Sequence, residues 1–270
     1  MTNTDNVEPE RHALPLKAVV RYDGGGFSGW QVQPERRTVQ GTIEDALARI
    51  AGQRVHIHGA GRTDAGVHAL GQVFSFAWPS GMPPATLRHA LCRMLGPEIR
   101  IESIEQVAPE FHARKSARAK RYAYCLDLAR PPDPFSARYA WSVPPDLDMM
   151  RVETLAQRVV GLRDFAGFQG GKSAVEDTVR RVYSVSVHRG GVIGPSDTGT
   201  VWRIEFHGDG FLYKMVRNIT GTLVEIARGA LPERRLDELL DAPAPFHGFT
   251  APGRGLFLLE VIYTTSIASP

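Results

Sequence analysis

The chain has 270 residues, and its hydrophobic share of 43% is ordinary for a globular protein that buries a core. Its formal net charge is only +3, so total charge alone does not identify a nucleic-acid-binding protein, and the positions of the basic residues have to decide. The two cysteines lie far apart without a pairing motif, and no apolar run reaches the roughly 20 residues of a membrane span, which excludes a disulfide scaffold and predicts a cytoplasmic protein.

The first half of the chain alternates strands and helices. Residues 1–15 are polar, mixed in charge and without a signal-peptide core, so we expect a disordered tail there. After it, apolar or alternating runs predict strands, and apolar residues at helical spacing predict amphipathic helices. The expected strands are residues 16–22, 54–57, 72–78 and 99–107. The expected helices are residues 39–51 and a second helix that Pro83-Pro84 begin and that apolar residues mark from 87 to 95.

The second half repeats this order with one extra helix. Its expected strands are residues 117–128, 178–188, 200–206 and 256–263, and its expected helices are residues 149–160, 211–226 and 232–240. Residues 130–146 are rich in proline and are expected to form a loop. Each half matches a split βαβ, or ferredoxin-like, plan, with boundaries at 16–115 and 116–265 and a short tail at 266–270.

The fold class expected from this order is α+β. Two similar ferredoxin-like halves can form one extended, mostly antiparallel sheet with helices on one face. The other face and the seam between the halves then remain available for a large ligand, and we place the cleft for it on the face without helices.

A short loop between two expected strands carries a carboxylate among small residues. Asp64 is flanked by Arg62 and Thr63 within the stretch HGAGRTDAGVHALG, residues 58–71. Small residues let another molecule approach the backbone, and a rigid sheet holds a short loop still. This pattern is compatible with a catalytic carboxylate, but from the spacing alone a plain turn with a solvated ion pair is the favoured interpretation.

A basic segment follows the first half. Residues 112–121 read HARKSARAKR, which contains no acid, and Tyr122 and Tyr124 follow directly. Phosphate contacts give affinity for a polyanion, and aromatic side chains stack on exposed bases. The segment therefore indicates that RNA is the ligand of the cleft, with a solvated basic face as the alternative.

Two other chemistries find weaker support. The stretch from Asp23 to Gly26 is glycine-rich, but it lacks the Gly-Lys-Ser/Thr ending of a phosphate-binding loop. His56 and His58, with His68 nearby, have no acidic or cysteine partner at metal-site spacing, so we expect no metal site.

Several separated segments resemble, in order, those of the TruA-type tRNA pseudouridine synthases. The stretch GRTDAGVHA, residues 61–69, is similar to the catalytic loop of that family and is the most specific of these motifs. The other similar segments are Tyr22-Asp23-Gly24, Gly29-Trp30-Gln31, Phe111-His112-Ala113-Arg114, Lys120-Arg121-Tyr122, Met215-Val216-Arg217-Asn218-Ile219 and Gly255-Leu256. Together they extend over nearly the whole chain, from about residue 16 to residue 263.

The resemblance implies that the protein isomerises uridine to pseudouridine in the anticodon stem-loop of tRNA, at positions 38, 39 and 40. It also implies a homodimer that contacts one tRNA with both subunits. No cofactor, nucleotide or membrane is implied, because the reaction breaks the N1–C1′ bond, turns the uracil and rejoins it through C5 without oxidation or hydrolysis.

The same resemblance implies roles for five residues. Asp64 takes the position of the catalytic aspartate, which can act as nucleophile or base, and Tyr122 takes that of the tyrosine that stacks on the target base. Arg62 resembles the arginine that pairs with this aspartate and fills the space of a flipped nucleotide. Arg217 resembles a second arginine near the carboxylate, and Leu256 resembles a late apolar contact.

Two rival interpretations remain. A non-catalytic RNA-binding protein can use the same basic cleft, but it leaves the Arg62-Thr63-Asp64 stretch without a role. A metal-dependent hydrolase or nucleotide triphosphatase is disfavoured because its motifs are missing from the sequence.

Overall fold

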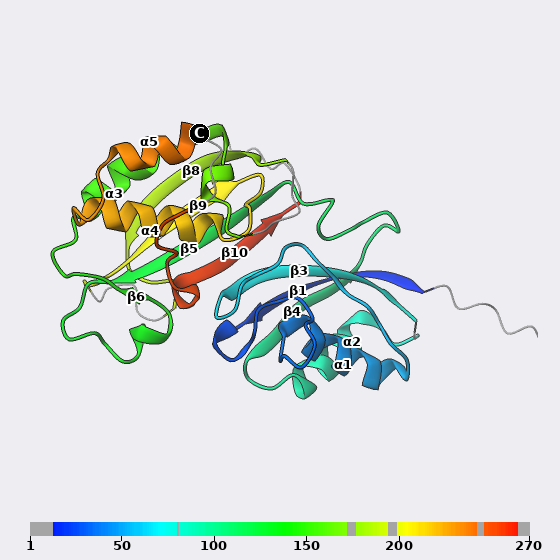
Figure 1. Ribbon diagram of the computed structural model, residues 1–270. Coiled ribbons are helices and arrows are strands. Elements are labelled where there is room, and N and C mark those ends of the chain that lie inside the picture. The colour runs from blue at the N-terminus through cyan, green and yellow to red at the C-terminus, as the bar shows by residue number, and fades with distance from the viewer. Residues whose placement is uncertain (1–12, 80, 172–176, 194–198, 242–245, 264–270) are drawn as a thin grey trace, which may run out of the picture.

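The computed structural model describes residues 13–79, 81–171, 177–193, 199–241 and 246–263. Residues 1–12 of the predicted N-terminal tail, and the predicted tail at 266–270, lie outside the described residues. The rest is an α+β protein built on one large, mostly antiparallel sheet, as the sequence predicts (Figure 1).

The described residues form a 10-stranded sheet. Its strands are β1 Leu14–Tyr22, β2 His58–Gly59, β3 His68–Trp78, β4 Ile99–Gln106, β5 Ala119–Asp127, β6 Trp141–Ser142, β7 Gly161–Asp164, β8 Val179–Arg189, β9 Val201–Gly208 and β10 Leu256–Ile262. The spatial order is β4-β1-β3-β10-β5-β9-β8-β7, with β2 paired to β3 and β6 paired to β5. Only the β10–β3 and β5–β6 pairs are parallel among these strands.

The helices pack in two groups. They are α1 Val39–Ala51, α2 Pro84–Met94, α3 Met149–Ala156, α4 Met215–Ala227 and α5 Arg234–Asp241. In Figure 1, α1 and α2 lie beside β1 and β4, whereas α3, α4 and α5 lie beside β5, β8 and β9. None of the helices in the described residues has the length and apolar character needed to cross a membrane.

The sheet has one face that packs against the helices, called here the helix side, and an opposite face. Alternate residues of each strand point to these two faces. In β5, Tyr122 and Tyr124 join the core that contains the buried face of α4, whereas Cys125 belongs to a small second cluster with Phe257. Because neighbouring residues of a strand point to opposite faces, Tyr122 lies on the helix side and Cys125 on the opposite side.

β10 joins the two parts of the sheet. It pairs antiparallel with β5 over most of its length and parallel with the start of β3, through Phe257 with His68 and Leu258 with Ala69. The last strand of the chain therefore closes the seam between β1–β4 and the later strands. The division into two halves at residues 115 and 116 stays a prediction.

The predicted strand at residues 54–57 is wrong. Val55 and Ile57 are buried and alternate with exposed neighbours, which is a strand pattern, but no strand of the described residues pairs with this segment. Side chains of α1 hold its backbone instead, because Glu44 accepts from the Ile57 amide at 3.0 Å and Gln40 donates to the Ile57 carbonyl at 3.2 Å. Pairing with β3 begins only at β2.

Other boundaries also differ from those predicted. The helix expected from residue 211 begins as α4 at Met215, because Lys214 has a φ of +60°, a left-handed conformation that interrupts a helix. Phe211 packs its ring against the edge of Tyr122 instead. The short β6 lies inside the proline-rich segment expected as a loop, and β7 is an unpredicted edge strand.

Candidate active site

The loop that carries Asp64 lies between β2 and β3 and is held by earlier segments of the chain. The Trp30 amide donates to the Thr63 carbonyl at 3.0 Å, and the hydroxyl groups of Tyr22 and Thr63 are 2.8 Å apart. Gly29 has a φ of +93°, and a Cβ on it would lie 2.6 Å from the Thr63 carbonyl oxygen. Only glycine permits this approach, so the loop backbone is fixed directly next to the carboxylate.

Asp64 forms an ion pair with an arginine from the far end of the chain. Nη1 of Arg217 is 2.6 Å from Oδ2 of Asp64, and the two side chains are only 13% and 17% exposed. Within the described residues, Oδ1 of Asp64 has no hydrogen-bond partner. The pair therefore orients the carboxylate while leaving one oxygen open to a substrate.

Backbone contacts orient Arg217 in turn. Its Nε donates to the Ala251 carbonyl at 2.8 Å, and its own carbonyl accepts from the Ala251 amide at 3.2 Å. Further along α4, a Cβ on Gly221 would lie 2.0 Å from the Phe249 carbonyl oxygen. Close packing of α4 on residues 249–251 therefore fixes the guanidinium that meets Asp64.

Tyr122 lies beside this pair on β5. Its side chain is buried on the helix side, and its ring meets the Phe211 ring edge-on with centroids 5.2 Å apart. Burial, followed by the charges of Tyr22 and Asp64, raises the pKa of Tyr122 above its ordinary value. The phenol is therefore protonated at neutral pH, close enough to Asp64 to respond to its charge.

The two other predicted site residues have different surroundings. Arg62 is exposed, and its Nε donates to Oε1 of Gln31 at 3.1 Å. The predicted pairing of Arg62 with Asp64 is therefore wrong, because the Arg62 guanidinium bonds to Gln31 and the arginine that contacts Asp64, at Oδ2, is Arg217. Leu256 is buried at the start of β10 and forms part of the wall next to β5.

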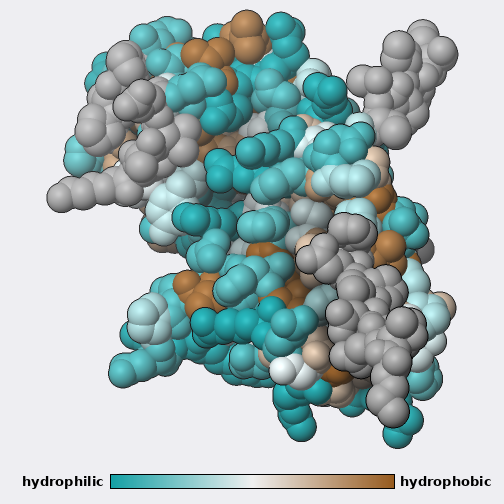
Figure 2. Space-filling view, turned by 90° about the vertical axis from the view of Figure 1, so that its right-hand side faces the viewer, coloured by the Kyte–Doolittle hydropathy of each residue, from teal (hydrophilic) through white to brown (hydrophobic). Residues whose placement is uncertain are grey.

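These groups meet on the helix side of the sheet. Tyr122 points to that side, and Arg217 lies in the first turn of α4. This differs from the expectation of a cleft on the face without helices, because the site lies in the seam between the two helix groups. Figure 2 shows a largely hydrophilic surface with an indentation at the height between the two groups.

Two residues that contribute to the site could not be identified individually from the sequence. Ala251 acts through its backbone, so its side chain gives no indication of its role. In the sequence, Lys120 belonged to the basic segment and to the stretch Lys120-Arg121-Tyr122 that resembles the family, without a role of its own. In the structure, its Nζ donates to the Ala60 carbonyl at 2.9 Å, close to the loop that carries Asp64. The available signal was its position two residues before Tyr122, which places both side chains on one face of a strand.

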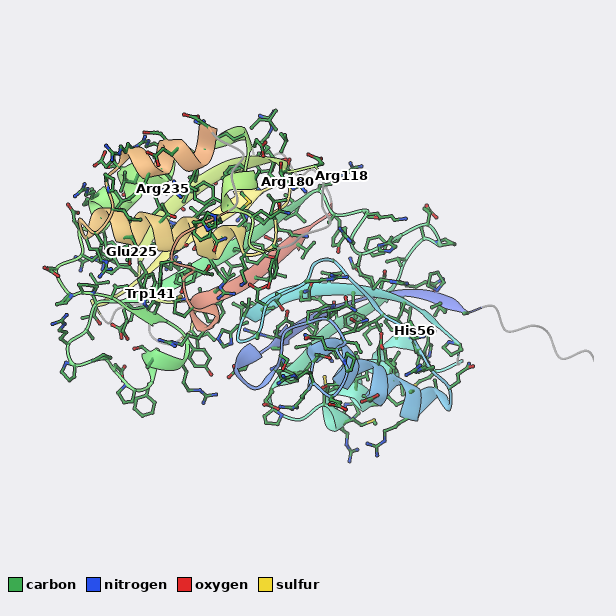
Figure 3. All side chains as sticks on the ribbon, in the orientation of Figure 1. His56, Arg118, Trp141, Arg180, Glu225 and Arg235 are labelled. Atoms are coloured by element: carbon green, nitrogen blue, oxygen red, sulfur yellow. The ribbon has the colours of Figure 1, made fainter. Side chains whose placement is uncertain are left out.

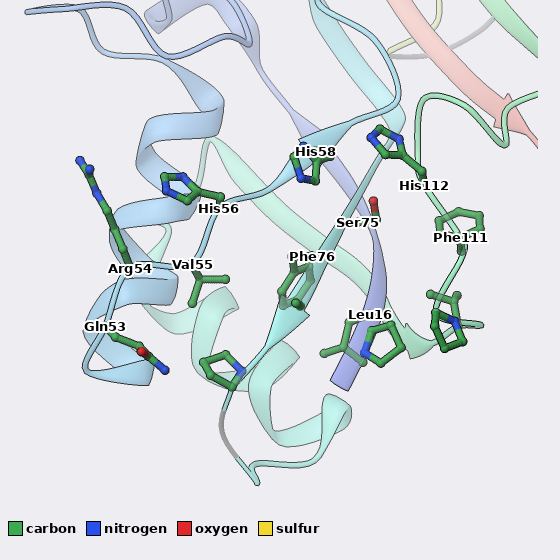
Figure 4. Close-up of a pocket in the computed structure, with 15 residues that line it drawn as sticks. Leu16, Gln53, Arg54, Val55, His56, His58, Ser75, Phe76, Phe111 and His112 are labelled. Atoms are coloured by element: carbon green, nitrogen blue, oxygen red, sulfur yellow. The ribbon is translucent and has the colours of Figure 1, made fainter. Parts of the chain in front are cut away.

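A separate cavity of about 480 Å³ opens on the N-terminal part of the molecule (Figure 4). None of the groups just described lines it. His58 and His112 stack at its edge with ring centroids 5.1 Å apart, whereas His68 is buried elsewhere. Within the described residues, no group of three or more His, Cys, Asp or Glu side chains is placed to hold a metal ion.

Comparison with known proteins bears directly on this site. A family model described as tRNA pseudouridine synthase matches residues 18–114 and 155–264, which include the Asp64 loop and α4, whereas β5 lies between the two matched ranges. A tRNA pseudouridine synthase A of Streptococcus suis is 42% identical over 250 residues, covering 92% of this chain and 98% of the relative. The tRNA pseudouridine synthase A of Brevibacillus brevis is 44% identical over 249 residues, covering 92% and 99%.

Similarity to solved structures is more distant. A crystal structure of a Cbf5-Nop10-Gar1 complex matches 77% of this chain and 53% of that chain, with a TM-score of 0.33 and 10% identity. The archaeal box H/ACA sRNP Nop10-Cbf5 complex matches 78% of this chain and 42% of that chain, with a TM-score of 0.32 and 12% identity.

Proposed function

The chain belongs to the tRNA pseudouridine synthase family, and we propose that it acts on the anticodon stem-loop, at positions 38, 39 and 40, with Asp64 as the catalytic carboxylate. The enzyme isomerises uridine to pseudouridine in tRNA. Family membership across most of the chain also argues against a non-catalytic RNA-binding protein, which was the alternative from the sequence.

The open oxygen of Asp64 supports its catalytic role. The reaction needs a group that attacks the nucleoside or removes a proton, and a carboxylate can do either. Arg217 engages Oδ2, which leaves Oδ1 without a hydrogen-bond partner in the described residues. The guanidinium holds the carboxylate in one orientation before substrate arrives, which lowers the reorganisation needed in the reaction.

Tyr122 supplies an aromatic face for the target base in this proposal. A uridine has to leave its stack to reach a loop carboxylate, at a cost of a few kcal/mol, and stacking on a tyrosine ring offsets part of it. Phe211 holds the ring edge-on. The protonated phenol can accept the C5 proton only while it passes its own proton to a base, and the nearby Asp64 carboxylate is suited to receive it.

Arg62 and Leu256 complete the proposed substrate contacts. The exposed guanidinium of Arg62 can enter the space left by the flipped nucleotide, because it does not hold Asp64. Leu256 is buried at the start of β10, opposite Tyr124 of β5, and in this proposal it provides the late apolar contact that the resemblance implies. A homodimer, as implied by the resemblance, and a cytoplasmic location, as expected from the composition, are part of the same proposal. Light scattering with and without tRNA tests the homodimer.

The observation that carries the proposal is the 2.6 Å contact between Asp64 and Arg217 across the seam. The experiment incubates a panel of unmodified tRNA transcripts with the wild type and with Asp64→Ala, and maps pseudouridine at each position. Asp45→Ala, which removes an exposed aspartate on α1, is the matched control.

We expect pseudouridine at anticodon-arm positions with the wild type and with Asp45→Ala. Asp64→Ala should bind the transcripts and leave them unmodified. Wild-type conversion by Asp64→Ala would remove the catalytic assignment, and modification confined to another arm of the tRNA would remove the proposed substrate site.

A further inference from the structure

Lys120 is a cation with no assigned function beside the catalytic loop. Its side chain lies on the helix side of β5, partly buried, with Nζ 2.9 Å from the Ala60 carbonyl oxygen. A Cβ on Gly61 would lie 3.0 Å from this nitrogen, so the amine can approach the loop closely because residue 61 is a glycine. An ammonium group has three donors, and within the described residues neither a second hydrogen-bond acceptor nor a carboxylate engages Nζ.

Two arginines approach the same amine. Burial, and then the charges of Arg114 and Arg180, lower the pKa of Lys120 to about 8. Arg114 is exposed at the end of the basic segment. Arg180 has an ion pair with Asp177 at 3.6 Å, but the Asp177 side chain is 80% exposed, so solvent weakens this pair.

The β-ladder explains why Lys120 and Arg180 come together. Lys120 lies opposite Gly208 in the β5–β9 pairing, and the chain turns directly after that residue. A Cβ on Gly210 would lie 3.4 Å from Cδ and Nε of Arg180, so the guanidinium stem lies along this turn. Figure 3 shows Arg180 and Arg118 at the same end of the sheet, where β8 and β5 begin.

Within the described residues, Lys120 and Arg114 have no carboxylate partner, and the one that Arg180 has is mostly exposed. Like charges that are balanced this weakly cost free energy in the free protein, and a bound anion lowers that cost. Each donor of such a group also matches a phosphate oxygen. We propose that Lys120, Arg114 and Arg180 form a phosphate-binding subsite for the RNA strand that enters the active site. The proposal rests on the proposed function, because it assigns this subsite to the RNA that carries the target uridine.

The position of the subsite limits which phosphate it holds. Residues two apart on a strand are separated by roughly 7 Å, and Lys120 and Tyr122 share one face. If the target base stacks on Tyr122, the phosphate at Lys120 belongs to that nucleotide or to its direct neighbour. The subsite would fix the backbone while the base leaves its stack, so it acts in substrate positioning.

The test is a scan of single methylphosphonate substitutions, which remove one phosphate charge at a time. The substrate is a synthetic anticodon stem-loop with one target uridine, and the readout is kcat/KM for pseudouridine formation. For the wild type, one substitution next to the target uridine should lower kcat/KM by roughly 10-fold, the size expected for one charge-assisted contact. Lys120→Met should have a kcat/KM about 10-fold lower than the wild type on the unsubstituted RNA, and the methylphosphonate at this phosphate should lower it no further.

Arg114→Gln is the second variant, because Arg114 is exposed and its loss leaves the buried amine in place. It should reduce the sensitivity to the same methylphosphonate. Arg93→Gln, which removes an exposed charge from α2, is the matched control and should keep the full wild-type sensitivity. Thermal unfolding of each variant establishes that it is folded.

Two results would overturn the subsite. Either the wild type shows no sensitive phosphate beside the target uridine, or Lys120→Met and Arg114→Gln retain the full wild-type loss at that phosphate. If the wild type does not modify the stem-loop but modifies a different arm of intact tRNA, this result contradicts the proposed substrate site and leaves the subsite to be tested. The same scan around that other uridine then decides the subsite separately.

Discussion

Two arginine–carboxylate clusters lie near the seam, and they differ in what their carboxylates still offer. Asp64 has Arg217 as its hydrogen-bond partner within the described residues. Asp23 accepts from the Gly25 amide at 2.9 Å, the Tyr139 hydroxyl at 2.9 Å and Arg138 at 3.1 Å. The first carboxylate is oriented and open, whereas the second is occupied on both oxygens.

The clusters also lie on different sides of the sheet. His68, whose Nδ1 is 3.1 Å from Oδ1 of Asp23, stacks on Phe257. Phe257 pairs with the residue next to Tyr122 in β5, so it faces away from the helix side. The comparison teaches that an ion pair close to the seam is not by itself a catalytic site. An acceptor oxygen that has no hydrogen-bond partner among the described residues distinguishes Asp64.

The largest expected difference in reaction rate is between the variants that lack Arg217 and those that lack Arg138. Arg217→Ala should lower the rate of pseudouridine formation by about 10²-fold, because the carboxylate loses the donor that orients it. Arg138→Ala should change the rate by less than about 3-fold, because it removes one exposed partner of an already occupied carboxylate. Single-turnover kinetics on one transcript measure the rates of both variants. Equal reductions in rate would contradict the proposed difference between the two clusters.

The two tyrosines provide a smaller test. Tyr122→Leu should weaken RNA binding by roughly 10-fold, since a stacked base contributes about 1–3 kcal/mol, whereas Tyr122→Phe keeps the ring and should bind within about 3-fold of the wild type. Tyr139→Phe should bind RNA normally, because its hydroxyl serves Asp23. Filter binding with unmodified transcript gives the comparison. Equal binding by the Leu and Phe variants at position 122 would refute stacking.

The smallest effect concerns acid stability. Burial alone would raise the pKa of Asp23, but hydrogen bonds from Gly25 and Tyr139 and the charges of His68 and Arg138 hold it below its ordinary value of 3.8. A lowered pKa stabilises the fold above about pH 4, and this stabilisation is lost as pH falls through the folded-state pKa.

The melting temperature of the wild type should therefore fall more between pH 5 and pH 3 than that of Asp23→Asn, which lacks the titrating group. Calorimetry or circular dichroism over this range provides the measurement. Parallel curves for the two proteins would show that the partners of Asp23 do not stabilise its charged form.

Local patterns in the sequence predicted most of the fold, because burial on one face leaves a periodic trace. This pattern gave a wrong prediction at residues 54–57. Burial alternates there as in a strand, with Val55 and Ile57 buried, but the backbone forms hydrogen bonds with side chains of α1. The pattern also failed at the start of α4, where the left-handed Lys214 breaks an apolar stripe that runs on without interruption in the sequence.

The family resemblance was confirmed, and the site was harder to predict in detail. The resemblance implied that Arg62 pairs with Asp64 and that Arg217 is a second arginine near the carboxylate. In the structure the partner is Arg217, 153 residues further along the chain. Such a contact depends on how β10 joins the two parts of the sheet, which no local pattern encodes. The side of the sheet that carries the site depends on the same joining.

The central claim is that RNA chemistry occurs at Asp64 in the seam, on the helix side of the sheet. The most direct measurement is a crystal structure of the Asp64→Asn variant with an anticodon stem-loop RNA. The account predicts the target uridine flipped onto Tyr122, with its N1 or C1′ atom within about 3.5 Å of the residue 64 side chain. An RNA bound on the opposite side of the sheet, with its uridines stacked and distant from residue 64, would contradict it.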